Sequence, residues 1–299
     1  MSWSTYISEY ISYLKIEKSL SKNSIEAYHR DIYMLQSFLE LQKLNIQPTQ
    51  IELQHLRDFI SWVNELGISA RTQARVISGI KSFYKYLLLD EKIENDPTAL
   101  LESPRIGRKL PVILSVNEID DLINAIDLSK PEGHRNKAII ETLYSCGLRV
   151  SELINLRLTD LFFDQGFIKI LGKGNKERLV PISQKAIKEI EIYINHYRIH
   201  SKTDKESENI LFLNRRGKML TRVMIFTVIK MLAKITGLQK SVSPHTFRHS
   251  FASHLIDGGA DLRAVQEMLG HESIITTEIY THLDTEYLRD TIIQYHPRA

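Results

Sequence analysis

The chain has 299 residues, of which 43% are hydrophobic and 25% charged, and its formal net charge is +3. This length favours two domains over one, and the composition is that of an ordinary globular protein. Residues 1–105 carry 12 Lys and Arg against 13 Asp and Glu, and the remainder carries 27 against 23. This mild balance does not by itself indicate nucleic-acid binding, which would require clustered basic residues.

Cysteine content and apolar patterning bear on the compartment. Cys146 is the single cysteine, which excludes an intrachain disulfide and fits a reducing compartment. The segment 1–18 carries Ser, Glu and Lys among its apolar residues, so it lacks the apolar stretch of a signal peptide. No apolar run approaches the roughly 20 residues of a membrane span. We therefore expect a cytoplasmic protein that does not act at a membrane.

The first hundred residues show helical periodicity in four segments. The first segment starts near the N-terminus, and the second follows Ser21. The third begins at Thr49, where Thr49 and Glu52 form a capping-box pattern, and it stops at Gly67. The fourth starts at Ser69. These segments predict a four-helix unit over residues 1–103.

Basic residues lie along the fourth of these helices. Arg71 and Arg75 are four residues apart and therefore share a face, and Lys81 and Lys85 follow them. A solvated helix face explains this pattern, and so does a set of contacts to DNA phosphates. The helix alone leaves both interpretations open.

A linker and a second domain follow. Prolines, a glycine and basic residues without periodicity mark residues 104–110 as the linker, so the second domain covers 111–299. There, Ser115 and Glu118 form a capping box, and a long apolar helix over about 134–146 ends at Gly147. The segments FIKIL and RLVPI flank turn residues and predict a β-hairpin. We expect a mainly α protein with a small β-sheet or hairpin, its second domain being α+β.

The stretch Ser243-Pro244-His245-Thr246-Phe247-Arg248-His249 is the richest in chemistry. Ser243 is a natural N-cap and Pro244 a natural first residue of a helix. His245 and Arg248 then share one face at a helix N-terminus, where free N–H groups and the helix dipole favour anions. This arrangement indicates a phosphate clamp.

Two further basic residues lie at turns. Arg149 follows the helix stop at Gly147 and precedes a helix start. It either caps the carbonyls of the preceding helix or presents a second guanidinium to a phosphate. Lys173 lies in the hairpin turn GKGNKER. It is either part of a soluble turn or a side chain that reaches into a DNA groove.

Downstream, three glycines and two N-cap residues divide the chain into helices. Gly258-Gly259 ends one helix, Asp261 caps the next, and that helix ends at Gly270, directly before His271. A further helix capped by Ser273 carries Tyr280. His271 and Tyr280 are nine positions apart, a separation that would span roughly 13 Å as a helix, so both side chains can meet one substrate from opposite sides.

A zinc site is the alternative for the histidine-rich segment. His245, His249 and His254 lie close together in sequence, and His pairs four apart can bind zinc. The chain has no HExxH motif and no cysteine cluster. We therefore expect no metal and no cofactor, with His249 and His254 in packing or hydrogen-bonding roles.

Six of these residues occur in the order and spacing of the tyrosine site-specific recombinases of the phage integrase family: Arg149, Lys173, His245, Arg248, His271 and Tyr280. The segments GLRVSEL, GKGNKERLVPI, SPHTFRHSFASHL and MLGHESIITTEIYTHL resemble the signature blocks of the Xer chromosome-dimer resolvases. EKSLSKNSIEAYHRDI, ARVISGIKSFYKYL and the tail 295–299 are also similar to Xer proteins. The resemblance spans nearly the whole chain and implies a SAM-like core-binding domain followed by a catalytic domain.

The resemblance implies how a scissile phosphate is held. Arg149, Arg248 and His271 would bind its non-bridging oxygens, and Glu152 matches an accessory acidic position. A phosphodiester under attack gains charge on its equatorial oxygens, which fixed guanidiniums stabilise through bidentate bonds. Such side chains take the place that Mg²⁺ has in two-metal nucleases.

The resemblance also assigns the covalent chemistry. Tyr280 would attack phosphorus and form a 3′-phosphotyrosyl link with a free 5′-hydroxyl. Because a phenol has an ordinary pKa near 10, it needs a neighbour to take its proton, and His245 would assist that transfer. Lys173 would protonate the departing 5′ oxygen. The phosphotyrosyl link conserves the energy of the cleaved bond, so rejoining through a Holliday junction needs no ATP.

The implied assembly is a C-shaped clamp around a duplex recombination site, with four protomers acting on two sites. The last helix, about 286–294, would dock into a neighbouring protomer, because Leu288, Ile292 and Ile293 would otherwise be exposed. A XerC-like partner and an FtsK-type translocase are further implied partners. An Xer housekeeping role is favoured over a mobile-element integrase, because no extra arm-binding domain precedes residues 1–103. A non-catalytic DNA-binding protein is the remaining alternative.

Overall fold

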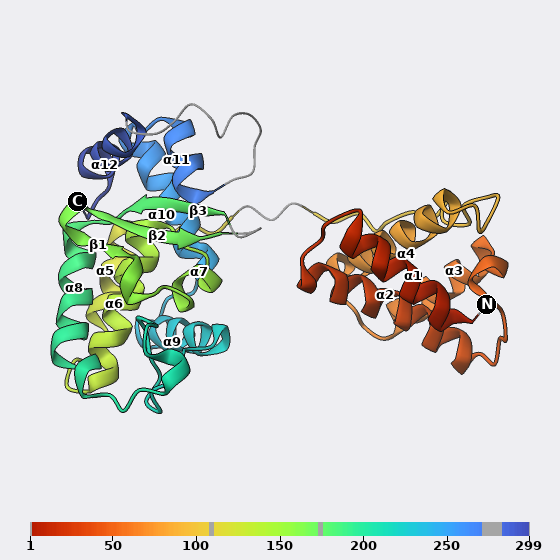
Figure 1. The fold of residues 1–299 in the computed structure, drawn as a ribbon, viewed down its shortest axis with the longest axis horizontal. Coiled ribbons are helices and arrows are strands. Elements are labelled where there is room, and N and C mark those ends of the chain that lie inside the picture. The colour runs from red at the N-terminus through yellow and green to blue at the C-terminus, as the bar shows by residue number, and fades with distance from the viewer. Residues whose placement is uncertain (1, 108–110, 173–175, 271–282, 299) are drawn as a thin grey trace. The chain divides into compact units, whose positions relative to one another are not determined.

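The computed structural model describes residues 2–107, 111–172, 176–270 and 283–298, the side chains of the last segment from 287 onward (Figure 1). The chain divides into two compact units, 1–109 and 110–299. Most described residues lie in helices, so the expected mainly α fold with a small sheet is confirmed. In the described part of the chain, no helix is both long and apolar enough to cross a membrane.

The first unit is built from helices whose apolar stripes face one another. Its helices are α1 (Trp3–Ile16), α2 (Lys22–Leu41), α3 (Leu53–Glu65) and α4 (Ala70–Leu89), with a 3₁₀ turn at Pro48–Gln50. Tyr10, Phe59 and Phe83 are fully buried where these helices meet. Aromatic side chains of this size dominate the apolar area that a small helical core removes from water.

The second unit wraps further helices around one buried helix and a three-stranded sheet (Figure 1). Its elements are α5 (Val116–Asn124), α6 (Pro131–Cys146), α7 (Val150–Ile154), β1 (Leu161–Phe162), β2 (Phe167–Leu171), β3 (Glu177–Pro181), α8 (Gln184–His196), α9 (Arg222–Ile235), α10 (Pro244–Gly258), α11 (Leu262–Leu269) and α12 (Leu283–Tyr295). Helix α6 is buried from Ala138 to its end and packs against α8 and α10. The sheet is antiparallel in the order β1-β2-β3, and β3 packs against α11 and α12.

Helix starts follow local capping chemistry. Ser21, Ser69 and Ser115 each accept a hydrogen bond from the backbone N–H three residues later. The Asp261 side chain accepts from the backbone N–H groups of the second and third residues of α11. Ser243 begins α10 with Pro244 as its first residue. These five predicted helix starts are confirmed.

One expectation at an element boundary is wrong, and one short strand was not predicted. The third helix begins at Leu53 instead of Thr49, because Pro48–Gln50 forms a separate 3₁₀ turn and Glu52 is the N-cap residue. The Glu52 N–H donates to His55 Nδ1, so the capping partner differs from the predicted one. Strand β1, which extends the hairpin to a sheet, was not predicted, because two residues carry no readable alternation.

The last described helix packs on its own chain. Leu288 and Ile292 of α12 are 4% and 2% exposed within the hydrophobic core of the second unit. Only Ile293 of the three apolar residues expected on the surface is exposed, at 61%. The expectation is therefore wrong for Leu288 and Ile292, because α10, α11 and β3 cover that face of the helix.

Candidate active site

Arg149 is delivered to the site by a sharp turn at the end of α6. Gly147 ends that helix in the left-handed region, at φ 57°. A Cβ atom there would lie 2.5 Å from Phe251 Cδ1, so both the backbone and the packing require glycine. After this turn, Arg149 is the N-cap residue of α7. The predicted helix stop thus places a guanidinium between two helices.

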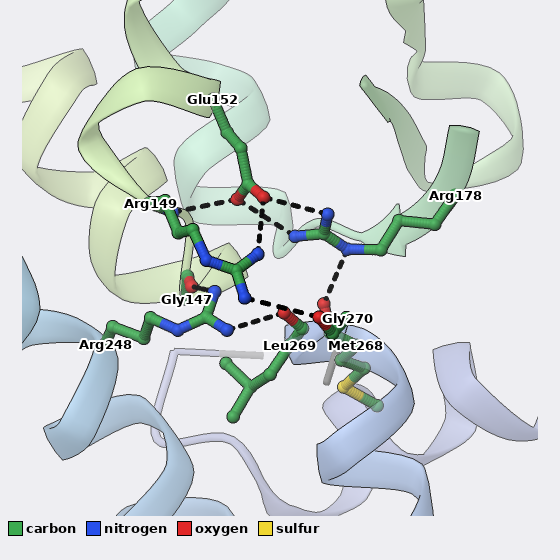
Figure 2. Close-up of polar contacts among 8 residues, drawn as sticks. All are labelled: Gly147, Arg149, Glu152, Arg178, Arg248, Met268, Leu269 and Gly270. Carbon is green, nitrogen blue, oxygen red and sulfur yellow. Dashed lines mark hydrogen bonds and ion pairs between the residues drawn. The ribbon is translucent and has the colours of Figure 1, made fainter. Parts of the chain in front are cut away.

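Glu152 binds Arg149 through both its backbone and its side chain (Figure 2). The Arg149 N–H donates to Glu152 Oε2 at 2.8 Å, and Arg149 Nη1 donates to Oε1 at 2.9 Å. A second guanidinium binds the same carboxylate: Nη1 and Nη2 of Arg178 each donate to one oxygen at 2.9 Å. Burial raises the pKa of Glu152, but the two arginines outweigh it and hold the pKa below its ordinary value.

Arg248 comes from the start of α10 and is 8% exposed. Its Nη1 donates to Gly147 O at 2.8 Å, and its Nη2 donates to Leu269 O at 2.5 Å. Burial, together with the charge of Arg149, lowers the pKa of Arg248 to about 10, so the side chain stays protonated at neutral pH. Arg248 therefore joins the end of α6 to the end of α11.

The C-terminal end of α11 receives an arginine at each of its last three carbonyls (Figure 2). Arg178 Nε donates to Met268 O at 3.1 Å, and Arg149 Nη2 donates to Gly270 O at 3.3 Å. The Leu269 carbonyl between them accepts from Arg248. Carbonyls at a helix C-terminus lack intrahelical partners and carry partial negative charge, so they suit cations. The helix end thus gathers three guanidiniums from three separate elements.

The charge of this group favours an anionic ligand. Three guanidiniums and the one carboxylate of Glu152 leave a surplus of two positive charges among these four side chains. Arg149 keeps 35% of its side chain exposed, so a ligand can reach it. A guanidinium has five N–H donors and matches a phosphate geometrically. The group can therefore hold a phosphodiester and stabilise charge that develops on its oxygens.

The structure brings together Arg149, Glu152 and Arg248 of the predicted site. His245 lies exposed on the first turn of α10, three residues before Arg248. The other three predicted catalytic residues fall outside the described residues: Lys173, His271 and Tyr280.

The contacts of Arg149 distinguish between its two interpretations. The end of α6 is bound by Arg248 at the Gly147 carbonyl, whereas Arg149 binds Glu152 and Gly270, so capping of α6 does not explain Arg149. His254 accepts or donates a 2.7 Å hydrogen bond with Tyr144, which confirms its hydrogen-bonding role. His249 is exposed. The described residues contain no cluster of three or more potential metal ligands.

Basic residues on α4 differ in their surroundings. Arg71 and Lys85 are exposed, and Lys81 is half-buried. Arg75 forms an ion pair with Asp31, whose side chain is 2% exposed. Arg75 therefore serves the fold of the first unit, with 46% of its side chain still accessible.

Arg178 is the site residue that the sequence reasoning missed. The register pairs Arg178 with Ile170 and Val180 with Ile168, so these four side chains share one face of the sheet. The three apolar members of that face are buried. A charged residue at an inward strand position requires a partner, and this alternation in ERLVPI was the available signal.

Comparison with known proteins identifies the family to which the chain belongs. The Phage integrase family matches residues 113–287, and the Phage integrase N-terminal SAM-like domain matches residues 7–91. Tyrosine recombinase XerD of Staphylococcus saprophyticus is 43% identical over 295 residues, covering 99% of each chain. Tyrosine recombinase XerD of Listeria innocua is 40% identical over 293 residues, covering 98% of this chain and 99% of the relative.

Solved structures share the fold. The XerA recombinase is 31% identical over the whole of both chains, with a TM-score of 0.51. The XerH site-specific recombinase, bound to its difH substrate in a pre-cleavage complex, gives a TM-score of 0.72 at 21% identity, covering 90% of this chain and 89% of XerH. Together with the three arginines at the end of α11, these matches show that the chain belongs to the phage integrase family, the family of the tyrosine recombinases.

Proposed function

We propose that this protein is a site-specific tyrosine recombinase that cleaves and rejoins DNA through a 3′-phosphotyrosyl intermediate. The observation that carries the proposal is the convergence of Arg149 and Arg248 from separate helices on the end of α11. Near-full-length relatives are tyrosine recombinases, so a phosphodiester is the anion that best fits this cluster.

The two arginines differ in how they would act on the phosphate. Arg248 is buried and fixed by two carbonyls, so its position changes little as charge develops. Arg149 is more accessible and is oriented by Glu152. Fixed donors aimed at developing charge avoid reorganisation during the reaction, and removing one such donor costs about a hundredfold or more in rate.

The remaining roles rest on the family motif. Tyr280 would be the nucleophile, Lys173 the acid that protonates the 5′ oxygen, and His271 a further phosphate ligand. His245, on the first turn of α10, would assist proton transfer near the nucleophile. With these residues, the reaction needs no metal and no cofactor.

The decisive experiment uses Tyr280→Phe on a suicide substrate with a nick near the cleavage point. We expect duplex binding to stay within about twofold of wild type and the covalent adduct to be lost, because only the phenolic oxygen is removed. Tyr287→Phe is the matched control, since Tyr287 is 52% exposed on α12. Failure of wild type to form an adduct would favour the non-catalytic DNA-binding alternative.

The cellular role proposed is resolution of chromosome dimers at segregation. Four protomers would act on two DNA sites, with a XerC-like partner and an FtsK-type translocase, and α4 would contact phosphates through Arg71, Arg75, Lys81 and Lys85. Deletion of the gene that encodes this protein is expected to increase the fraction of cells with unsegregated chromosomes, scored by microscopy. A recombination site at the ends of a mobile element would favour an integrase instead.

A further inference from the structure

Arg178 occupies a position where an arginine needs a structural reason. It stands on the inner face of β3, beside Ile168, Ile170 and Val180, which are at most 1% exposed. Only 15% of the Arg178 side chain is exposed. A guanidinium is costly to remove from water unless its charge and its N–H groups are satisfied.

Protein acceptors bind all three nitrogens of the Arg178 guanidinium. Both terminal nitrogens donate to Glu152 at 2.9 Å, and Nε donates to Met268 O at 3.1 Å. Gly270 permits this approach, because a Cβ there would lie 3.1 Å from three guanidinium atoms of Arg178. The guanidinium of Arg178 is therefore directed at α7 and α11 (Figure 2).

Glu152 is shared evenly between two arginines. A carboxylate offers about four acceptor sites. Arg178 fills two of them, and the N–H and Nη1 of Arg149 fill two more. With Arg178 in place, the carboxylate has one orientation that satisfies all four donors, and that orientation fixes the guanidinium of Arg149.

We propose that Arg178 is a positioning residue that acts through Glu152 to hold Arg149 in the orientation needed for the scissile phosphate. This inference rests on the proposed DNA cleavage. Arg178→Met is expected to reduce the rate of covalent adduct formation by between about tenfold and a hundredfold, because small displacements of a positioning group have effects of this size. DNA binding should stay within about threefold of wild type.

The first test compares two substrates. A methylphosphonate at the cleavage point replaces a charged non-bridging oxygen by methyl, so the transition state depends less on Arg149. On this substrate the rate of Arg178→Met should lie within about threefold of the wild-type rate. Arg149→Ala should also regain a rate within about threefold of wild type. An equal loss on both substrates would overturn the proposal, because a purely structural defect does not depend on phosphate charge.

The second test is a double-mutant cycle with Glu152→Gln. If Arg178 acts through Glu152, then adding Arg178→Met to Glu152→Gln lowers the rate by less than about twofold more. Losses that multiply would overturn the proposal, because they would show that Arg178 acts on DNA independently of Glu152. Thermal melting accompanies each variant, and Arg178→Lys, which keeps the charge but loses the fork, repeats both tests if Arg178→Met does not fold.

Lys169→Met is the matched control, because it removes a positive charge from β2 of the same sheet. Lys169 pairs with Asp160 and Glu177 and has no contact with Glu152 among its ion pairs. Its rate should stay within about twofold of wild type on both substrates. Failure of the proposed function would appear in wild type itself, as absence of the adduct, whereas failure of this inference would appear only in the ratios.

Discussion

The guanidinium of Arg298 lies 2.7 Å from the carboxylate of Glu141, joining the last residues of the chain to the middle of α6. Their side chains are 3% and 0% exposed. Arg298 also forms an ion pair with Asp120 of α5, and its guanidinium lies over the ring of Tyr144. The segment after α12 is thus held by the second unit of its own chain.

Replacing Arg298 by Met should destabilise the second unit by roughly 3–5 kcal/mol, because Glu141 would stay buried without its partner. Burial raises the pKa of Glu141 although Arg298 opposes this, so the carboxyl would take up a proton once Arg298 is absent. Urea unfolding at neutral pH measures the change.

Two further variants test that explanation. Arg289→Met removes an arginine from the exposed side of α12, where the side chain is 44% accessible, and should change stability by less than about 0.5 kcal/mol. Glu141→Met combined with Arg298→Met should recover most of the loss, because no buried charge remains. A double variant no more stable than Arg298→Met would contradict the ion-pair explanation.

His296 should make the protein sensitive to acid. Burial lowers its pKa from 6.5 to about 4, so the folded protein keeps it neutral where the unfolded chain is protonated. Between these pH values the unfolded state binds more protons, so stability falls as pH decreases and rises as pH increases. Above pH 6.5 the shifted pKa of His296 contributes about 3 kcal/mol to the free energy of unfolding. This contribution is lost progressively as the pH falls from 6.5 to 4.

The measurement is the free energy of unfolding at several pH values for wild type and His296→Asn. The variant should show a shallower dependence on pH in this window. His200→Asn removes an exposed histidine and should keep the wild-type slope. Equal slopes for wild type and His296→Asn would show that His296 does not cause the sensitivity.

Local chemistry explains the parts of the fold that were predictable. A cap such as Ser243 or Asp261 acts within one turn of its own helix, and a left-handed glycine such as Gly147 ends a helix wherever it occurs. The family motif then supplied Arg149 and Arg248 as candidates, and the structure brings them together.

Long-range relationships explain the parts that were not predictable. Arg178 faces Glu152 only because the strand register turns it inward, and the two residues are 26 positions apart. Leu288 and Ile292 form an apolar stripe whichever chain covers it, so periodicity does not distinguish a neighbour from the chain's own core. Such outcomes depend on tertiary packing.

Arg149 and Arg248 should respond differently to substitution by Lys. Both variants lose bidentate phosphate binding, so both should cleave at least about a hundredfold more slowly. Arg248→Lys should also lower stability by about 1–3 kcal/mol, because one amine leaves a buried carbonyl of Gly147 or Leu269 without a donor. Arg149→Lys should affect stability less, since Arg149 is 35% exposed and Glu152 keeps Arg178.

Adduct formation and urea unfolding, measured on the same preparations, test this contrast. Gln266→Ala on α11 serves as a control for general effects of substitutions near that helix end, and because the side chain is exposed, stability should stay within about 0.5 kcal/mol of wild type. Equal stability losses in the two arginine variants would contradict the distinct roles assigned to them.

Substitutions of Arg71 and Arg75 should distinguish an effect on DNA binding from an effect on the stability of the first unit. Arg71 is exposed, so Arg71→Ala should reduce the dependence of log Kd on log salt concentration by about 1 without changing stability. Arg75→Ala should also destabilise the unit by about 1–3 kcal/mol, because it removes the hydrogen-bond partner of Asp31, which is 1% exposed. Salt titration of binding and thermal melting give the two quantities. Unchanged stability in Arg75→Ala would show that Asp31 does not need this ion pair, and an unchanged salt dependence in Arg71→Ala would remove this residue from the DNA-binding face.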